Sequence, residues 1–193
     1  MLGFYKLNPN IKIPEYATEL SACFDLRAWL ANDTFVKSYS YKNDELPLMV
    51  QSPRSLAASF LSHNWRQKHL HLIIQPGHRV MVPTGLILDI PEGYSVRIHP
   101  RSSLSLKQGL VLANAEGVID ADYIDPLYIL IMNVSGLPAH IAHDERIAQG
   151  ELVQLPSREF RIHGEASIAP QQKTSRVGGF WVNGNRMSLM NIV

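Results

Sequence analysis

Short apolar or alternating runs, separated by glycine and proline, dominate the chain from Leu70 onward. They include HLHLII, PGHRV, LILDI, SVRIH and IAQGELVQL, and the turns between them contain PTG and PEG. Strands at such short and regular spacing are typical of an all-β barrel or sandwich. A chain of 193 residues has the length of one domain that can bury a core without disulfides or a structural metal. We therefore expect one all-β domain.

The composition excludes several classes of function. The formal net charge is +1 at pH 7, so the chain lacks the broad basic surface of a protein that binds nucleic-acid polymers. Cys23 is the only cysteine, which excludes an internal disulfide framework and a thiolate zinc cluster and fits a reducing compartment. No apolar run approaches the ~20 residues of a membrane span, and the first residues lack a signal-peptide pattern. We expect a cytoplasmic protein that binds no membrane.

The segment GVIDADY, from Gly117 to Tyr123, places two carboxylates and a phenol in a glycine-led turn. The apolar runs VLANAEGVID and PLYILIMNV flank it and predict strands, so Asp120 and Asp122 are expected where a hairpin reverses. Aspartate is common in turns because its side chain bonds nearby backbone groups. Taken alone, the motif is therefore also compatible with a purely structural turn.

Two parts of the chain depart from the barrel pattern. Residues from about 32 to 69 do not follow it, and within them Ser52 followed by proline resembles a helix N-cap, with apolar residues recurring at helical spacing after it. We expect an insertion there that contains one short amphipathic helix. Long insertions are often functional, so an additional protein partner for this segment stays open. From about residue 164 the sequence has little periodicity, which predicts a flexible C-terminal arm.

Five segments occur in the order and character of one family's motifs: SACFDLRA, HPRSSLS, NAEGVIDADY, HDERIAQGELV and RVGGFWVNG. On these segments the chain resembles the trimeric dUTP pyrophosphatases, and the resemblance covers most of the chain outside residues 32–69. It implies a jelly-roll-like β-barrel and a homotrimer whose sites draw on several subunits. It also implies Mg²⁺-dependent hydrolysis of dUTP to dUMP and pyrophosphate, which limits the incorporation of uracil into DNA.

The resemblance assigns roles to residues of the first and third motifs. Asp120 matches the carboxylate that activates the attacking water, and Tyr123 matches the aromatic residue that packs on the sugar and leaves no room for a ribose 2′-hydroxyl. Asn114, with Gly117 in the same hairpin, matches the residues that bind the pyrimidine. An amide both donates and accepts, which suits the edge of uracil. Asp25 matches the aspartate that helps to hold a hydrated Mg²⁺.

The second and fourth motifs would hold the triphosphate. Arg101, Ser102 and Ser103 offer a guanidinium group, hydroxyls and main-chain N–H groups to phosphate oxygens. Gln149 matches a glutamine that contacts phosphate in the family. Arg146, in the same motif, is expected to be a buried structural partner.

The fifth motif departs most from the family pattern. Arg176 and Phe180 match residues of a C-terminal arm that covers the nucleotide, with the phenylalanine stacking on the base. Trp181, Val182 and Asn183 stand where glycine and small hydroxyl residues are expected. We expect closure over the triphosphate to be either weaker than in the family or adapted to these bulky residues.

Two alternatives belong to other functional classes. The dCTP deaminases share the fold and an RSS segment, but their chemistry needs a glutamate on the strand after the third motif. Residues Leu127 to Asn133 contain no acidic side chain, and Leu106 stands where the deaminases favour arginine. The second alternative is a nucleotide-binding or regulatory barrel with weakened catalysis. The joint presence of Asp25, Arg101 and Asp120 favours turnover instead.

Overall fold

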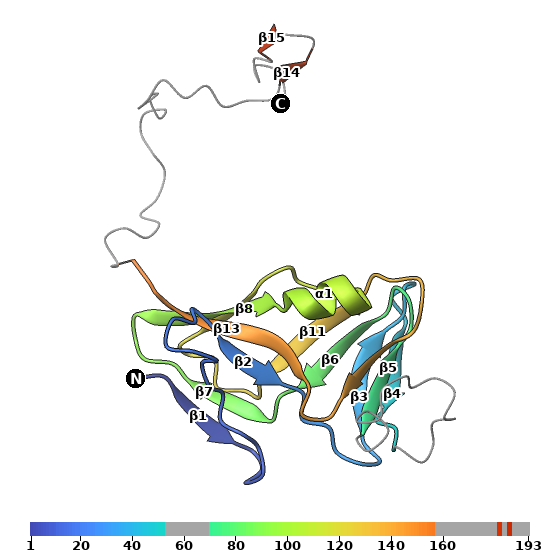
Figure 1. Cartoon of the computed structure of the whole chain (residues 1–193), viewed down its shortest axis with the longest axis horizontal. Helices are drawn as coiled ribbons and strands as arrows, with labels where there is room; N and C mark the ends of the chain where they lie inside the picture. Colours follow the sequence, from blue (N-terminus) through green and yellow to red (C-terminus); the bar gives the residue numbers. More distant parts are fainter. Residues whose placement is uncertain (53–69, 157–180, 183–184, 187–193) are drawn as a thin grey trace. The chain divides into compact units, whose positions relative to one another are not determined.

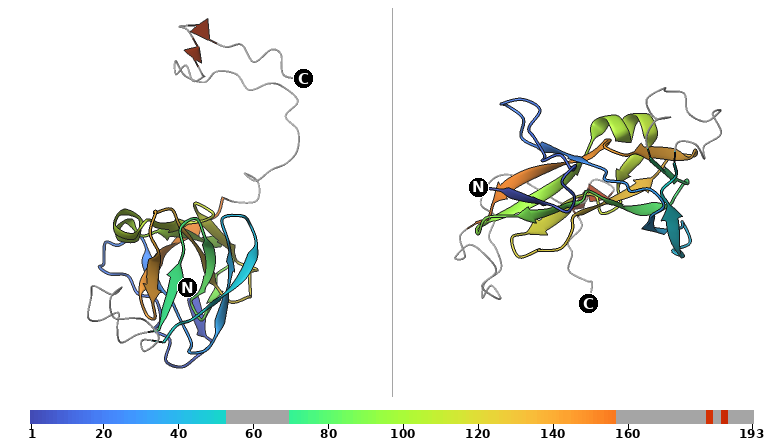
Figure 2. Two further views of the ribbon diagram at one scale, coloured as in Figure 1. Left: turned by 90° about the vertical axis from the view of Figure 1, so that its right-hand side faces the viewer. Right: turned by 90° about the horizontal axis from the view of Figure 1, so that it is seen from below.

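The computed structural model describes residues 1–52, 70–156, 181–182 and 185–186. The chain divides into two units, Met1–Ser157 and Arg158–Val193, and each is described by itself. In the first unit, strands from distant parts of the sequence wrap around a common centre (Figures 1 and 2). Within the described residues there is no helix with the length and hydropathy needed to span a membrane.

The strands are short, as the spacing of the apolar runs predicts. Their order is β1 (Gly3–Lys6), β2 (Phe24–Arg27), β3 (Phe35–Tyr39), β4 (Glu45–Met49), β5 (His71–Ile74), β6 (Arg79–Pro83), β7 (Leu86–Asp89), β8 (Tyr94–Pro100), helix α1 (Ser102–Gln108), β9 (Leu110–Leu112), β10 (Gly117–Asp120), β11 (Tyr128–Asn133), β12 (Ala139–Ala142), β13 (Arg146–Gln154), β14 (Trp181–Val182) and β15 (Asn185–Arg186). The predicted all-β class is confirmed.

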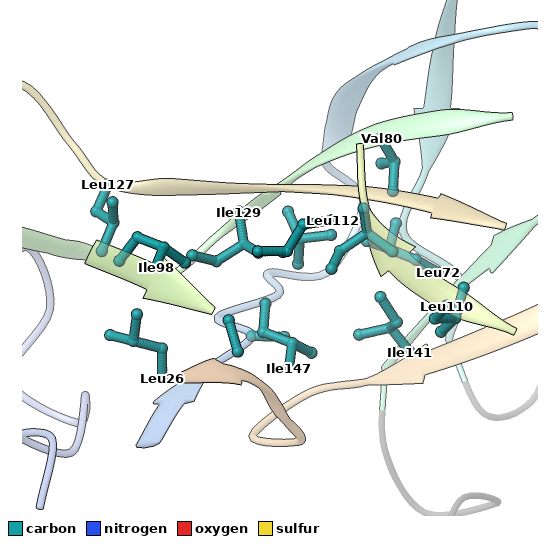
Figure 3. Close-up of a cluster of buried hydrophobic side chains, with 14 of the residues drawn as sticks. Leu26, Leu72, Val80, Ile98, Leu110, Leu112, Leu127, Ile129, Ile141 and Ile147 are labelled. Atoms are coloured by element: carbon teal, nitrogen blue, oxygen red, sulfur yellow. The ribbon is translucent and has the colours of Figure 1, made fainter. Parts of the chain in front are cut away.

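Two antiparallel sheets build the jelly-roll-like barrel. One has the strand order β10-β8-β13-β2 and the other the order β4-β3-β6-β11-β9, while β1–β7 and β12–β5 form two-stranded pairs. The core lies between the sheets: Leu26 and Ile147 reach it from the first sheet, and Val80 and Ile129 from the second (Figure 3). Burying each such side chain contributes about 1.5–3 kcal/mol to folding.

Alternation along the strands decides which residues are left for chemistry. In β2, Phe24 and Leu26 are buried, whereas Asp25 and Arg27 point to the other face of the sheet. In β8, Val96 and Ile98 enter the core, so Arg97 and His99 point outward. Because side chains in a strand alternate with a period of two, the apolar core fixes the outward direction of these polar groups.

The first part of the predicted insertion is a regular part of the barrel. Strands β3 and β4 pair with each other, and β3 joins the five-stranded sheet where Ser38 faces Val80. For residues 35–49, the expectation that they lie outside the barrel pattern is therefore corrected, whereas an insertion in the rest of residues 32–69 remains a prediction. In β3, Val36 and Ser38 are buried and Phe35 is exposed, so apolar and polar residues do not alternate as they do in a typical half-buried strand. The predicted helix after Ser52 falls outside the described residues, and an additional protein partner there remains a prediction.

Strand β4 lies at the edge of the five-stranded sheet and contains Pro47. Val50 donates to the carbonyl of Thr34 at 2.8 Å, and Ser40 donates to that of Asp44 at 2.9 Å. Hydrogen-bonded pairs recur every second residue in an antiparallel ladder, so the main-chain groups of Pro47 face away from β3. The imide nitrogen without a proton thus stands on the outer edge of the sheet.

The expected hairpin after Asp120 is instead a crossing between sheets. Strand β10 pairs with β8, whereas β11 pairs with β6 and β9 of the other sheet. Both runs are apolar, so sequence alone predicts two strands but not which neighbours they select. Helix α1 was also missed, although Lys107 in its last turn and Gly109 after its end are typical of a helix C-terminus. Gly109 takes a φ of 63°, which glycine tolerates without strain.

The second unit contains the short pair β14–β15, in which Trp181 faces Arg186. Most of the predicted arm from about residue 164 falls outside the described residues, as do Arg176 and Phe180. Their expected roles at the nucleotide therefore remain predictions.

Candidate functional site

Strands β2 and β13 and the end of β8 bring together four polar residues, which we name the Asp25 cluster: Asp25, Arg101, Arg146 and Gln149. In register, Gln149 lies opposite Asp25 on β2. The Asp25 carboxylate pairs with Arg101 Nε at 3.3 Å and accepts a hydrogen bond from Arg146 Nη1 at 2.9 Å. Gln149 donates from Nε2 to the carbonyl oxygen of Pro100 at 3.0 Å, which ties β13 to the residue before Arg101.

Arg101 is held from two sides. Besides its contact with Asp25, its Nη1 donates to the carbonyl oxygen of Arg146 at 3.1 Å. It also precedes helix α1, which presents the exposed side chains of Ser102 and Ser103. The structure therefore brings together most of the residues that the sequence predicts to hold a triphosphate. Arg146 is not the buried partner that we expected, because its side chain is 44% exposed and adds a second guanidinium group to the cluster.

The predicted role of Asp25 in holding a hydrated Mg²⁺ remains a prediction. Both oxygens of Asp25 are engaged by guanidinium groups, which carry positive charge where a metal ion would bind. Among the described residues, no group of three histidine, cysteine, aspartate or glutamate side chains is placed to hold a metal ion. The chemistry of this donor set fits an anionic ligand better than a resident cation.

A second feature, which we name the Asn114 pocket, opens beside β10 and has a volume of about 240 Å³. It contains three residues of the third motif, Asn114, Gly117 and Tyr123, among mostly apolar neighbours. The whole lining consists of Met81, Ile98, Leu112, Asn114, Gly117, Val118, Ile119, Tyr123, Leu127, Tyr128, Ile129 and Leu130. A mostly apolar cavity with one amide and two phenols suits a planar heterocycle with a polar edge.

Gly117 is required by close packing. It lies opposite Ile98, and a Cβ atom added at Gly117 would stand 3.0 Å from the Cβ of Ile98 and 3.5 Å from Nδ2 of Asn114. The absence of a side chain therefore lets the turn approach β8 closely. This explains in physical terms why glycine leads the motif.

Asp120 ends β10 with its side chain exposed, and its carbonyl oxygen accepts the Tyr123 N–H at 3.1 Å. In the described part of the chain no side chain pairs with the Asp120 carboxylate. Tyr123 donates from its hydroxyl to the carbonyl oxygen of Pro126 at 3.2 Å. Partial burial, together with the negative charge of Asp125, raises the pKa of Tyr123, so its phenol stays protonated. Asp122 is an exposed turn residue, as predicted.

One chain does not bring Asp120 and the Asp25 cluster together. Asp120 faces Ser95 on β8, and Arg101 follows six residues later. At roughly 3.3 Å per residue, about 20 Å separate these two points along the strand. A triphosphate chain is much shorter, so a ligand bound at Arg101 does not reach Asp120 of the same chain.

Sequence reasoning missed a group of charged residues on the outward face of the four-stranded sheet. Glu116 pairs with Arg97 at 3.5 Å and lies 3.6 Å from His99, whose Nε2 is 3.0 Å from Glu151. The signal was weak in sequence, because these residues come from three separate segments. Register brings them together, since Arg97 faces Glu151 across the ladder.

The fold and the two features define a jelly-roll-like barrel protein with a cluster suited to an anionic ligand and a separate pocket of heterocycle size. The profile of the dUTPase family matches residues 68–178. The chain is 40% identical over 186 residues to the deoxyuridine 5′-triphosphate nucleotidohydrolase of Brucella melitensis, covering 95% of this chain and 92% of the relative. The chain belongs to the dUTPase family.

Two further comparisons agree with this assignment. The deoxyuridine 5′-triphosphate nucleotidohydrolase of Chlamydia felis is 32% identical over 162 residues, with 84% of each chain covered. The crystal structure of the Streptococcus mutans dUTPase superposes with a TM-score of 0.55 at 22% identity and covers 80% of this chain and 96% of that one. At that identity the structural likeness supports the fold alone.

Proposed function

We propose that this protein hydrolyses dUTP to dUMP and pyrophosphate and thereby limits uracil incorporation into DNA. The observation that carries the proposal is the identity of 40% along nearly the whole chain to a relative named for this reaction. The Asn114 pocket supports it, because its amide can donate to and accept from uracil. Tyr123 closes the same pocket with an aromatic ring suited to pack on a deoxyribose.

In the proposed reaction Asp120 accepts a proton from water, whose oxygen attacks the α-phosphorus. The bond between that phosphorus and the bridging oxygen of the β-phosphate breaks, and pyrophosphate leaves with its electron pair. Arg101, the serine hydroxyls after it and Gln149 hold the triphosphate and neutralise the charge that develops on its oxygens. The exposed Asp120 carboxylate has no protein partner in the described residues, which leaves it free to act as a base.

The substrate in this proposal is the magnesium complex of dUTP. Because the Asp25 carboxylate is already engaged by two arginines, the ion enters with the triphosphate and not as a resident cofactor. The part of Asp25 in the reaction is then to orient Arg101 and Arg146. The described β11 carries no acidic side chain, so the structure adds no support to the dCTP deaminase alternative.

The protein would work as a homotrimer in which Asp120 of one copy faces the Asp25 cluster of another. The separation of about 20 Å within one chain supports this arrangement. Closed rings of identical subunits generate such shared sites by repeating one interface.

The test is pyrophosphate release from dUTP, dCTP, dTTP and UTP with Mg²⁺, with Asp120→Asn as the blank. We expect turnover of dUTP and rates near the blank for the other three nucleotides. Ammonia from dCTP without pyrophosphate would favour the deaminase, and no turnover of any nucleotide would favour a binding or regulatory role.

A further inference from the structure

Four charged side chains meet on the outward face of the four-stranded sheet, and we name them the His99 network: Arg97, His99, Glu116 and Glu151. Nε2 of His99 lies 3.0 Å from a carboxylate oxygen of Glu151, a hydrogen-bond distance. Nδ1 of the same ring lies 3.6 Å from Glu116, whose other oxygen is 3.5 Å from Nη1 of Arg97. The imidazole therefore stands between two carboxylates that come from different parts of the chain.

The strand register aligns this network with the Asp25 cluster. His99 faces Gln149 on β13, and Gln149 in turn faces Asp25 on β2. Residues that oppose each other in a ladder share one face of the sheet. A row of side chains thus runs across the outward face from Asp25, through Gln149 and His99, to the turn before β10.

Glu116 belongs to the turn that presents Asn114. Its main-chain N–H donates to the carbonyl oxygen of Asn114 at 2.7 Å. Ala115 between them takes a φ of 61°, and its N–H donates to the carbonyl oxygen of Leu112 at 3.2 Å. The backbone of Asn114 is hydrogen-bonded to that of Glu116. Holding the Glu116 side chain on β8 therefore also limits the movement of Asn114.

Charge makes this arrangement sensitive to the loss of one member. A single exposed ion pair stabilises little, but several charges held in one network act together. Without His99, Glu151 loses the partner that lies 3.0 Å from its carboxylate, and Arg97, 3.5 Å away, is the only group of this network left beside Glu116. Arg97 alone would then hold Glu116 on β8, so we expect the turn to move more freely.

We infer that the His99 network is a tether that positions the turn carrying Asn114, and that Arg97, His99 and Glu151 are positioning residues for the pyrimidine base. The inference rests on the proposed function, because it names the base as the ligand of this turn. None of the three residues contacts the reacting phosphorus in this scheme. Their effect is on base binding and selectivity, transmitted through Glu116.

Steady-state kinetics with Mg²⁺ and dUTP tests the tether. We expect His99→Leu and Glu116→Gln to raise KM about five- to tenfold while kcat stays within about twofold, because the interaction affects binding and not the chemical step. His99→Gln, which restores a donor toward Glu151, should recover most of the wild-type KM. Glu45→Gln is the matched control, since it removes a carboxylate from an exposed cross-strand pair with Lys37 at 2.9 Å, and its KM should be unchanged.

A double-mutant cycle separates the tether from general destabilisation. If His99 and Glu116 act through one contact, the double variant should raise KM no more than the worse single variant. Multiplicative effects of the two substitutions would overturn the inference. A fall in kcat without a change in KM for His99→Leu would overturn it as well.

Amide hydrogen exchange of the ligand-free protein measures the mobility of this turn and does not depend on enzymatic turnover. We expect the amides of residues 113–117 to exchange faster in His99→Leu than in the wild type, and to exchange at the wild-type rate in Glu45→Gln. Unchanged exchange in His99→Leu would contradict the tether. If the wild type fails to hydrolyse dUTP, the proposed function fails, and this exchange measurement still decides whether His99 holds the turn.

Discussion

In the Asp25 cluster every charged side chain has a partner, whereas the Asp120 carboxylate next to the Asn114 pocket has none in the described part of the chain. The cluster is organised before any ligand binds, since two guanidinium groups are fixed by one carboxylate and one carbonyl oxygen. Near Asp120 the Asn114 pocket is already formed, but no described side chain balances the charge of the Asp120 carboxylate. In the proposed reaction, one chain thus organises the groups that would bind phosphate and leaves the carboxylate that would accept the proton unpaired.

The two regions also differ in how their main chain is held. Gln149 lies between β2 and β8, which hold it from both sides, and Asp25 pairs with it from the edge strand β2. Asn114 lies in a turn that depends on a close glycine contact and on the His99 network. We therefore expect changes near the cluster to affect stability first, and changes near the pocket to affect nucleotide binding first.

The largest effect is expected from a substitution of Asp120, the proposed general base beside the Asn114 pocket. Asp120→Asn should lower kcat by about 10³-fold, since a positioned general base contributes roughly 10²–10⁴. Binding of a non-hydrolysable imido analogue of dUTP, measured by calorimetry, should change little because the amide keeps the shape of the side chain. An equal loss of binding would assign Asp120 a structural role.

Mixing two inactive variants tests whether the two regions act across copies. Arg101→Ala disables the cluster and Asp120→Asn disables the pocket side, so each variant alone should be inactive. After joint refolding in equal amounts, random assembly gives about one quarter of sites an intact cluster and an intact Asp120, if they come from neighbouring copies in a closed ring. We expect pyrophosphate release near that fraction of the wild-type rate, and no recovery would place both groups in the same chain.

Two glycine substitutions compare the stability of the regions. A Cβ atom at Gly150 would collide with the ring of Phe24 below the cluster, while one at Gly117 would press on Ile98. We expect Gly150→Ala to lower the free energy of unfolding by about 2–3 kcal/mol and Gly117→Ala by about 1 kcal/mol, within the usual cost of overpacking. Urea denaturation measures both, and Gly117→Ala should in addition raise KM for dUTP.

The smallest effect concerns the phenol of Tyr123. Tyr123→Phe removes the hydrogen bond to Pro126 but keeps the ring, so KM should rise about two- to threefold. The raised pKa keeps the phenol protonated, so the ratio of the variant and wild-type KM values should stay constant between about pH 7 and about pH 9. A ratio that changes across this range would show that the hydroxyl ionises in it.

The class of fold follows from the sequence because apolar runs and turn residues mark the strands after Leu70 locally. The third motif was also readable, and the structure places Asn114, Gly117 and Tyr123 around one pocket. The ribbon of β3 and β4 was not predicted, since apolar and polar residues do not alternate regularly in β3 and β4 carries Pro47. Its place in the sheet depends on β6, which is distant in sequence.

Contacts between distant segments were the main omission at the site. No local pattern predicts that Arg146 donates to Asp25, or that His99 stands between Glu116 and Glu151, because strand register alone creates these neighbours. Register is fixed by the core residues on the opposite face of the same strands. The polar partners could therefore be derived only after the pairing of β8 with β10 and β13, and of β13 with β2, was known.

The proline on the outer edge of β4 has a consequence for the behaviour of the protein in crowded solution. An edge strand offers main-chain donors and acceptors to any other extended chain, which is how aggregates add strands. Pro47 removes a donor from the outward row of β4, so a second strand that docks there loses a hydrogen bond in mid-ladder. This edge thus resists polymerisation while remaining within the sheet, and a copy of the chain that approaches it would have to associate through side-chain surfaces instead.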